Sequence, residues 1–265
     1  MSMHDQVLAF FGFSRLPFGK HLTPTDTFPS SAHQEATSRL SFGVADEDLL
    51  LLSGPIGCGK SVALAAFVDQ LDGNRYRPLY LRGGGLSAAQ LFKAILEELK
   101  IDPPFFAGQA RQLFFKTIPE LAKKPVVILD DAQDLAATAL TAIKGMVNFA
   151  FDSSNSITFV LAGQPELREL LRYAPFASLR QRIRISYHMP PMALEETCRY
   201  IDHHTARCGR PTPIFADDAK VDIHRHAGGL PRLVNTVCYR SILHAVSNDT
   251  HIIDSTNLVT DELDS

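Results

Sequence analysis

A glycine-rich segment that ends in a lysine and a serine is the part of the sequence best suited to bind phosphate groups. It matches the spacing Gly-x-x-x-x-Gly-Lys-Ser and consists of Gly54, Pro55, Ile56, Gly57, Cys58, Gly59, Lys60 and Ser61. Glycines let consecutive backbone N–H groups turn toward phosphate oxygens, and a helix that follows adds its positive end. We therefore predict that the segment binds ATP, with Lys60 at the β- and γ-phosphates and Ser61 on Mg²⁺. A glycine-rich turn without a ligand is the alternative.

Two adjacent aspartates, Asp130 and Asp131, directly follow an apolar run at residues 126–129. Ligands of α/β proteins bind where such strands end. We expect Asp130 to hold the water shell of Mg²⁺, and Asp131 to orient and deprotonate the attacking water. Most ATPases of this design have glutamate at the second position, so the shorter Asp131 predicts slow hydrolysis or a nucleotide switch with little turnover. The alternative for the pair is a helix N-cap.

Apolar runs that alternate with helical spacing predict the elements that position these residues. The expected strands are 49–53, 78–82, 126–129 and 157–162, and the expected helices between them are 61–71, 87–100, 111–122 and 138–151. Continuous apolar runs are typical of strands that are buried on both faces. Strands that alternate with helices pair in parallel. The sequence thus predicts the α/β class, with a P-loop NTPase αβα core around a parallel sheet.

The pattern changes after Pro190 and Pro191. The sequence that follows is expected to be mostly helical, with helices at 194–207, 217–226 and 230–245 and in a short C-terminal segment. Before the core, residues 1–35 include three prolines and five phenylalanines. The prolines interrupt this segment too often for a long helix, and the phenylalanines make it too aromatic for a free tail. We therefore predict an N-terminal arm at 1–35 packed on the core, a nucleotide-binding core at 36–189 and a helical lid at 190–265.

Four later segments resemble AAA+ ATPases of the ExeA/GspA family. They are Asp130-Asp131-Ala132-Gln133, LAGQPEL at 161–167, LRQRI at 179–183 and GGLPRLVN at 228–235. Together with the phosphate loop and the phenylalanine-rich start, the resemblance extends over nearly the whole chain. The chain is also similar to the ATPase helpers of DNA transposition, the TnsC, TniB and MuB group. The resemblance implies an AAA+ core with a helical lid and ATP bound between them.

The resemblance also implies roles for residues outside the phosphate loop. Gln164 matches the sensor 1 position, where a polar side chain contacts the γ-phosphate or the water. Arg232 matches sensor 2, an arginine of the lid that responds to the nucleotide. Arg182, with Arg180 as second choice, matches the arginine finger, which reaches the site of a neighbouring subunit. A solvated basic face on a half-exposed strand is the alternative for Arg180 and Arg182.

Composition limits the classes of function. A hydrophobic fraction of 45% with 21% charged residues indicates a globular protein, neither disordered nor membrane-spanning. The net charge of −3 argues against a protein that coats nucleic acid through bulk charge, although a local basic surface is not excluded. Four widely spaced cysteines favour the reducing cytoplasm. The membrane segment and peptidoglycan-binding region of the ExeA architecture are not found, which also favours a free cytoplasmic ATPase.

These observations predict a Mg²⁺-dependent ATPase that assembles with itself into a ring or filament. Its expected role is to bind double-stranded DNA and to regulate or target transposition through a partner transposase, without a membrane partner. One alternative is an ExeA/GspA-type ATPase that assists the assembly of a secretion complex. The other is a nucleotide-switched scaffold with negligible hydrolysis.

Overall fold

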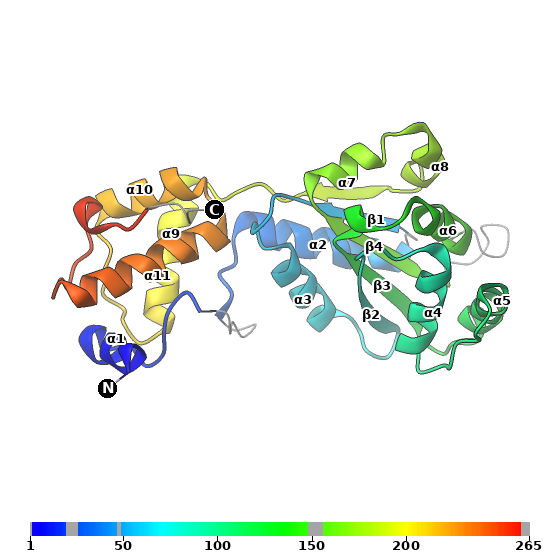
Figure 1. Cartoon of the computed structure of the whole chain (residues 1–265), viewed down its shortest axis with the longest axis horizontal. Coiled ribbons are helices and arrows are strands. Elements are labelled where there is room, and N and C mark those ends of the chain that lie inside the picture. Colours follow the sequence, from blue (N-terminus) through cyan, green and yellow to red (C-terminus); the bar gives the residue numbers. More distant parts are fainter. Residues whose placement is uncertain (1, 20–25, 47–48, 148–155, 261–265) are drawn as a thin grey trace. The chain divides into compact units, whose positions relative to one another are not determined.

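The computed structural model describes residues 2–19, 26–46, 49–147 and 156–260. Contacts between residues divide the chain into two compact units (Figure 1). The helical unit consists of Met1–Gln34, Ile56–Gly59 and Pro190–Ser265. The sheet unit consists of Glu35–Pro55 and Lys60–Met189.

The sheet unit is built on five strands in the order β2-β3-β4-β1-β5. They are β1 (Leu49–Ser53), β2 (Tyr76–Arg82), β3 (Lys124–Asp130), β4 (Thr158–Gly163) and β5 (Ile185–His188). All neighbouring strands pair in parallel, which confirms the predicted parallel-sheet α/β fold. The sequence did not predict β5, because this edge strand has only four residues and is mostly half-buried, so it lacks a continuous apolar run.

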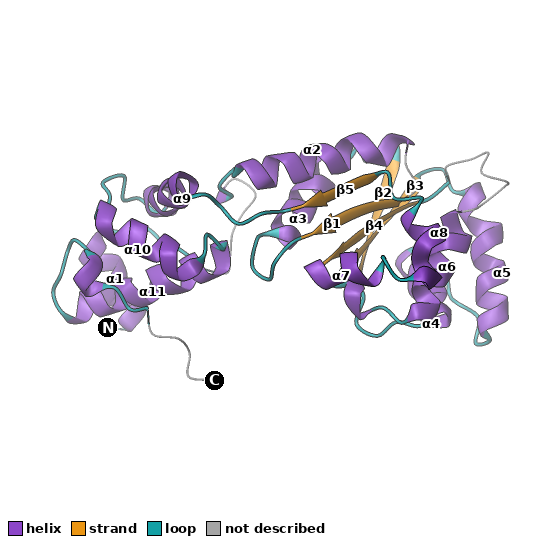
Figure 2. Ribbon diagram, turned by 90° about the horizontal axis from the view of Figure 1, so that it is seen from above, coloured by secondary structure: helices purple, strands orange, loops and turns teal. Residues whose placement is uncertain are grey.

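Helices cover both faces of this sheet. They are α2 (Ser31–Asp46), whose first turn belongs to the helical unit, α3 (Lys60–Gln70), α4 (Ala88–Glu98), α5 (Ala107–Thr117), α6 (Ala137–Val147), α7 (Pro165–Leu170) and α8 (Ala177–Arg180). Figure 2 shows α2 on the side of the sheet opposite to α4 and α6. Leu49 and Leu51 of β1 join the core formed with α4 and α6. The intervening Leu50 faces α2, where a Cβ on Gly43 would lie 2.6 Å from Leu50 Cδ2.

The helical unit has its own apolar core. Its helices are α1 (Met3–Phe11), α9 (Leu194–Arg207), α10 (Asp217–Ala227) and α11 (Pro231–Ser247). Four buried side chains of the N-terminal arm, those of Val7, Phe11, Phe13 and Phe18, pack in this core with residues of α9, α10 and α11. The arm thus packs on the helical unit, whereas the sequence predicted packing on the nucleotide-binding core. The prediction missed this because α9–α11 present an apolar surface that becomes visible only when the helices are assembled.

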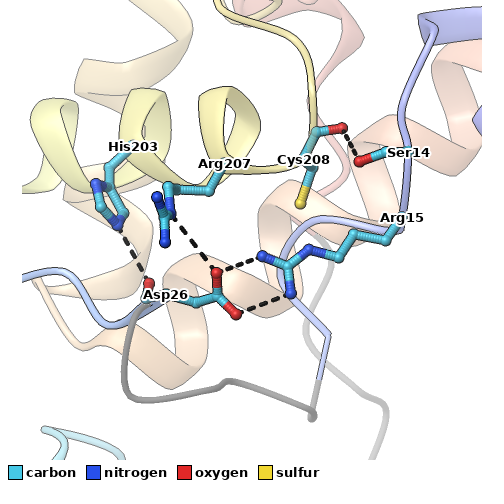
Figure 3. Close-up of polar contacts among 6 residues, drawn as sticks. All are labelled: Ser14, Arg15, Asp26, His203, Arg207 and Cys208. Atoms are coloured by element: carbon cyan, nitrogen blue, oxygen red, sulfur yellow. Dashed lines mark hydrogen bonds and ion pairs between the residues drawn. The ribbon is translucent and has the colours of Figure 1, made fainter.

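Polar contacts attach the arm to the end of α9 (Figure 3). The Arg15 guanidinium donates two hydrogen bonds to the buried Asp26 carboxylate, of which the bond from Nη1 measures 2.8 Å. Arg207 Nε of α9 lies 3.6 Å from Oδ1 of the same carboxylate. Just after the helix, the Cys208 carbonyl accepts hydrogen bonds from the Ser14 backbone N–H and Oγ. Because Asp26 is buried, these two guanidinium groups offset the cost of removing its charge from water.

A buried histidine, His204, lies beside this attachment on α9. Its side chain is enclosed by aromatic rings, with the Tyr200 centroid at 4.3 Å and the Phe18 centroid at 5.7 Å. Within the described residues, its Nε2 has no hydrogen-bond partner. Burial, with a smaller effect of the neighbouring His203, lowers the pKa of His204 to about 4. The folded helical unit therefore keeps this ring neutral at pH values where an unfolded chain would protonate it.

The pKa of His204 predicts that the protein loses stability as the pH falls from about 6.5 to about 4. In this range His204 is protonated in the unfolded state but stays neutral in the folded state. This difference lowers the free energy of unfolding by at most about 1.4 kcal/mol per pH unit. We expect His204→Phe, which keeps an aromatic ring in the core, to flatten this dependence. Urea unfolding at several pH values measures it, and His226→Phe on the exposed face of α10 is the control. Equal pH slopes for wild type and His204→Phe would contradict the prediction.

Candidate functional site

The predicted phosphate loop connects β1 to α3. β1 ends at Ser53 and α3 begins at Lys60, so residues 54–59 form the turn between a buried strand and a helix. Gly57 and Gly59 have φ angles of 79° and 102°, which glycine adopts more readily than any other residue. This is the strand-loop-helix context that the motif requires to turn its backbone N–H groups toward phosphate.

Lys60 folds back over the loop from the first position of α3. Its side chain is buried, and Nζ donates hydrogen bonds to the Gly54 carbonyl at 2.7 Å and to the Pro55 carbonyl at 3.0 Å. These two carbonyl oxygens satisfy the ammonium group within the sheet unit. The positive charge predicted to meet phosphate is therefore held at the loop itself.

The Asp130 carboxylate lies next to the loop, at the end of β3. Asp130 is buried, and its Oδ2 accepts hydrogen bonds from Ser61 Oγ at 3.2 Å and from Tyr80 Oη at 2.6 Å. Its Oδ1 accepts the backbone N–H of Asp131 at 3.0 Å. The tertiary structure thus brings together Ser61 and Asp130, the two residues predicted to bind metal. Hydroxyl and carboxylate oxygens are the hard ligands that Mg²⁺ prefers, so these residues fit that ion.

Tyr80 is a member of this cluster that the sequence did not single out. It lies on β2, which pairs with β3 so that Arg82 stands opposite Asp130. Burial of the hydroxyl and its bond to Asp130 raise the pKa of Tyr80 to about 12. The feature that could have indicated Tyr80 is its position near the end of β2, the strand that pairs with β3. That indication required knowledge of the strand order, which the sequence alone does not give.

Asp131 turns away from the strand in an unusual conformation. Its φ angle of 53° is left-handed, a region in which aspartate is more common than most other residues. It precedes a short 3₁₀ turn at Ala132–Asp134, but its side chain makes no capping hydrogen bond to this turn, all of which is described. Gly83 packs against this corner, where a Cβ would lie 2.4 Å from the Asp131 carbonyl oxygen. The exposed Asp131 carboxylate is thus not engaged as the helix cap considered from the sequence.

Gln133 connects Asp131 to Gln164, a role that was not predicted for Gln133 from the sequence. Its Oε1 accepts the backbone N–H of Gln164 at 3.0 Å, and its Nε2 donates to Asp131 Oδ1 at 3.4 Å. Gln164 directly follows β4 and precedes α7. Gly163 leaves room for this bridge, because a Cβ there would lie 2.5 Å from Gln133 Oε1. The side-chain amide of Gln133 therefore contacts both Asp131 and Gln164, which are the residues predicted to contact the attacking water.

The arginines predicted from the resemblance lie in three places. Arg180 is exposed at the end of α8, and Arg182 is half-buried in the turn before β5, so residues 180–182 do not form the half-exposed strand considered as an alternative. Arg232 is the second residue of α11 in the helical unit. Residues 56–59 belong to the same unit, and the Arg232 backbone N–H donates to the Gly57 carbonyl at 3.2 Å.

Among the helices of the described residues, none is both long and apolar enough to cross a bilayer.

Comparison with known proteins identifies the domain that carries the loop. Residues 44–171 match the family described as an AAA domain. General secretion pathway protein A of Aeromonas hydrophila is 31% identical over 252 residues, which are 92% of this chain and 46% of that protein. The chain therefore spans less than half the length of this relative.

Solved structures share the fold at low sequence identity. Cdc6p from Pyrobaculum aerophilum matches with a TM-score of 0.73 and 17% identity, covering 89% of this chain and 67% of that one. The ORC2 protein of Aeropyrum pernix, solved as ADPNP and ADP complexes, matches with a TM-score of 0.68 and 14% identity, covering 91% and 68%. A RuvB variant of Thermotoga maritima matches with a TM-score of 0.56 and 17% identity, covering 84% and 66%. The chain thus has the P-loop NTPase fold, residues 44–171 match an AAA domain, and 92% of the chain is similar to part of general secretion pathway protein A.

Proposed function

We propose that this protein binds ATP together with Mg²⁺ and hydrolyses it. The observation that carries the proposal is the 3.2 Å hydrogen bond between Ser61 Oγ and Asp130 Oδ2. It joins the loop suited to phosphate with the carboxylate suited to the metal, although 69 residues separate them in the chain. The AAA domain match and the nucleotide complexes of ORC2 support the same assignment.

Each residue of the site has a role in this proposal. The loop from Gly54 to Gly59 holds the phosphates through its backbone N–H groups, and the Lys60 ammonium neutralises the β- and γ-phosphates. Ser61 and Asp130 would hold Mg²⁺, which would supply positive charge beside the phosphates. Asp131 accepts the proton of the attacking water. Gln164 contacts the γ-phosphate or this water, from a position fixed by Gln133.

Completion of the site depends on further arginines. We propose Arg232 as the residue of the helical unit that responds to the bound nucleotide. Arg182, or Arg180, is proposed as the finger that enters the site of a neighbouring copy. An arginine supplied in this way can change turnover by several orders of magnitude, so hydrolysis would depend on assembly into a ring or filament.

The first biological role that we propose is assistance to a secretion complex. The similarity to general secretion pathway protein A over 92% of this chain supports it. Regulation of transposition through double-stranded DNA and a transposase is the second candidate, and the related fold of Aeropyrum pernix ORC1, solved in complex with DNA, makes DNA a ligand to test. We propose the cytoplasm as the location for either role.

A DNA titration of ATP hydrolysis separates the two roles. If the protein acts on a secretion complex, duplex DNA should leave the rate of phosphate release unchanged, even at low salt. Stimulation that weakens as salt rises would overturn this role and favour transposition, because contacts to DNA phosphates release counterions. Filter binding of labelled duplex with ATP, with ADP and without nucleotide gives the matching affinity measurement.

Nucleotide binding should depend on Lys60. We expect Lys60→Ala to weaken the binding of a fluorescent ATP analogue by at least about tenfold, since hydrogen bonds to charged groups contribute about 1.5–3 kcal/mol. Lys116→Ala removes an exposed lysine of α5 and should leave the affinity unchanged. Circular dichroism verifies that both variants are folded. Wild-type affinity in Lys60→Ala would exclude the proposed phosphate site.

The length of the Asp131 side chain should limit turnover. We expect Asp131→Glu to accelerate phosphate release at saturating ATP by up to about a hundredfold, because a misplacement near 1 Å can cost that much in rate. Stability should fall slightly, since the left-handed backbone at this position suits aspartate better than glutamate. Asp102→Glu, in the loop before α5, is the matched control. Equal turnover in wild type and Asp131→Glu would argue against this limit, and rates should be compared at equal protein concentration.

A further inference from the structure

The Tyr80 side chain makes a short hydrogen bond to the Asp130 carboxylate. As a residue Tyr80 is 46% exposed. The hydroxyl nevertheless donates to the buried Asp130 carboxylate, with Oη 2.6 Å from Oδ2. This length is typical of a charge-assisted bond between a hydroxyl and a carboxylate, which is roughly twice as strong as a neutral one. The contact therefore ties the buried Asp130 carboxylate to β2.

The Asp130 carboxylate accepts three hydrogen bonds. An ionised carboxylate has about four lone-pair sites, two on each oxygen. Tyr80 and Ser61 donate to Oδ2, and the Asp131 backbone N–H donates to Oδ1. One site on Oδ1 then remains for a further donor, such as a water bound to a metal. The three bonds also fix the rotation of the carboxylate, because they reach it from β2, from α3 and from the backbone of Asp131.

Tyr80 can hold this orientation because strand pairing fixes its own position. β2 and β3 pair in parallel along their whole length, from Tyr76 opposite Lys124 to Arg82 opposite Asp130. Gly83, directly after β2, donates its N–H to the Asp130 carbonyl at 2.6 Å. The backbone on both sides of Tyr80 is thus bonded to the strand that ends in Asp130.

We propose that Tyr80 is a positioning residue that orients the Asp130 carboxylate for Mg²⁺. This inference rests on the proposed function, since it assigns Asp130 to the metal that accompanies ATP. Tyr80 itself touches neither the metal nor the nucleotide. Its loss should therefore weaken the coupling between Mg²⁺ and nucleotide, while the phosphate loop keeps its own affinity.

A Mg²⁺ titration of nucleotide binding tests this role in the full chain. A fluorescent ATP analogue is bound to wild type and to Tyr80→Phe, first in excess EDTA and then at rising Mg²⁺ concentration. We expect the half-saturating Mg²⁺ concentration to rise about tenfold in Tyr80→Phe, the lower end of the effect of losing a partner of a metal ligand. The affinity measured in EDTA should stay at the wild-type value. Tyr173→Phe, which changes an exposed tyrosine of the same unit, should match wild type in both measurements.

A double-mutant cycle with Asp130→Asn identifies the group through which Tyr80 acts. If Tyr80 acts through the carboxylate, Tyr80→Phe should produce no further shift in the Asp130→Asn background. Equal Mg²⁺ curves for wild type and Tyr80→Phe would overturn the proposal, and so would a loss of affinity in EDTA, which indicates a general structural role. Absence of Mg²⁺-dependent binding in the wild type would instead refute the proposed function. Far-ultraviolet circular dichroism verifies the fold of each variant.

Discussion

The carboxyl ends of β1, β3 and β4 lie at one edge of the sheet because all neighbouring strands pair in parallel. β1 leads there into the phosphate loop, β3 ends in Asp130, and β4 leads to Gln164. Every residue of the site within the sheet unit depends on this arrangement for its position. An antiparallel strand in the place of β3 would move the acidic pair to the opposite edge, away from Ser61. The pairing direction is thus the constraint from which the chemistry of the site follows.

Burial of charged groups at this edge is balanced by local hydrogen bonds. Lys60 and Asp130 are exposed by only 9% and 7%, so each would lose much of its hydration energy if it were unpaired. Two loop carbonyls accept hydrogen bonds from the Lys60 ammonium, and the Asp130 carboxylate accepts hydrogen bonds from three donors. Hydrogen bonds within the protein therefore hold the polar side chains of the site in place. Such preorganisation lowers the cost of ordering groups when a ligand arrives.

The N-terminal arm shows how a correct local inference can lead to a wrong partner. Its phenylalanines indicated an ordered segment, and their burial agrees with that expectation for Phe11, Phe13 and Phe18. The surface that receives them is formed by α9, α10 and α11, not by the sheet unit. Asp26, paired with Arg15 and Arg207, adds a polar attachment between positions far apart in the chain. The surface that receives the phenylalanines is not identifiable from hydrophobicity alone, because every apolar surface of a fold attracts phenylalanine equally. Hydrophobicity likewise does not identify the arginines that pair with Asp26.

The sequence by itself determined four of the five strands and the phosphate loop, since these follow from residues that are close in the chain. Continuous apolar runs located β1, β3 and β4, and glycine spacing located the turn before Lys60. The short edge strand β5 was not predicted, because it has too few residues for a pattern. The role of Tyr80 was not predicted, because its partner Asp130 lies on a neighbouring strand. Only the tertiary structure decided which side chains meet: Ser61 with Asp130 across 69 positions, Tyr80 with Asp130 across 50, and Gln133 with Gln164 across 31. Strand order and register set these meetings, and they result from the packing of the whole sheet rather than from any local segment.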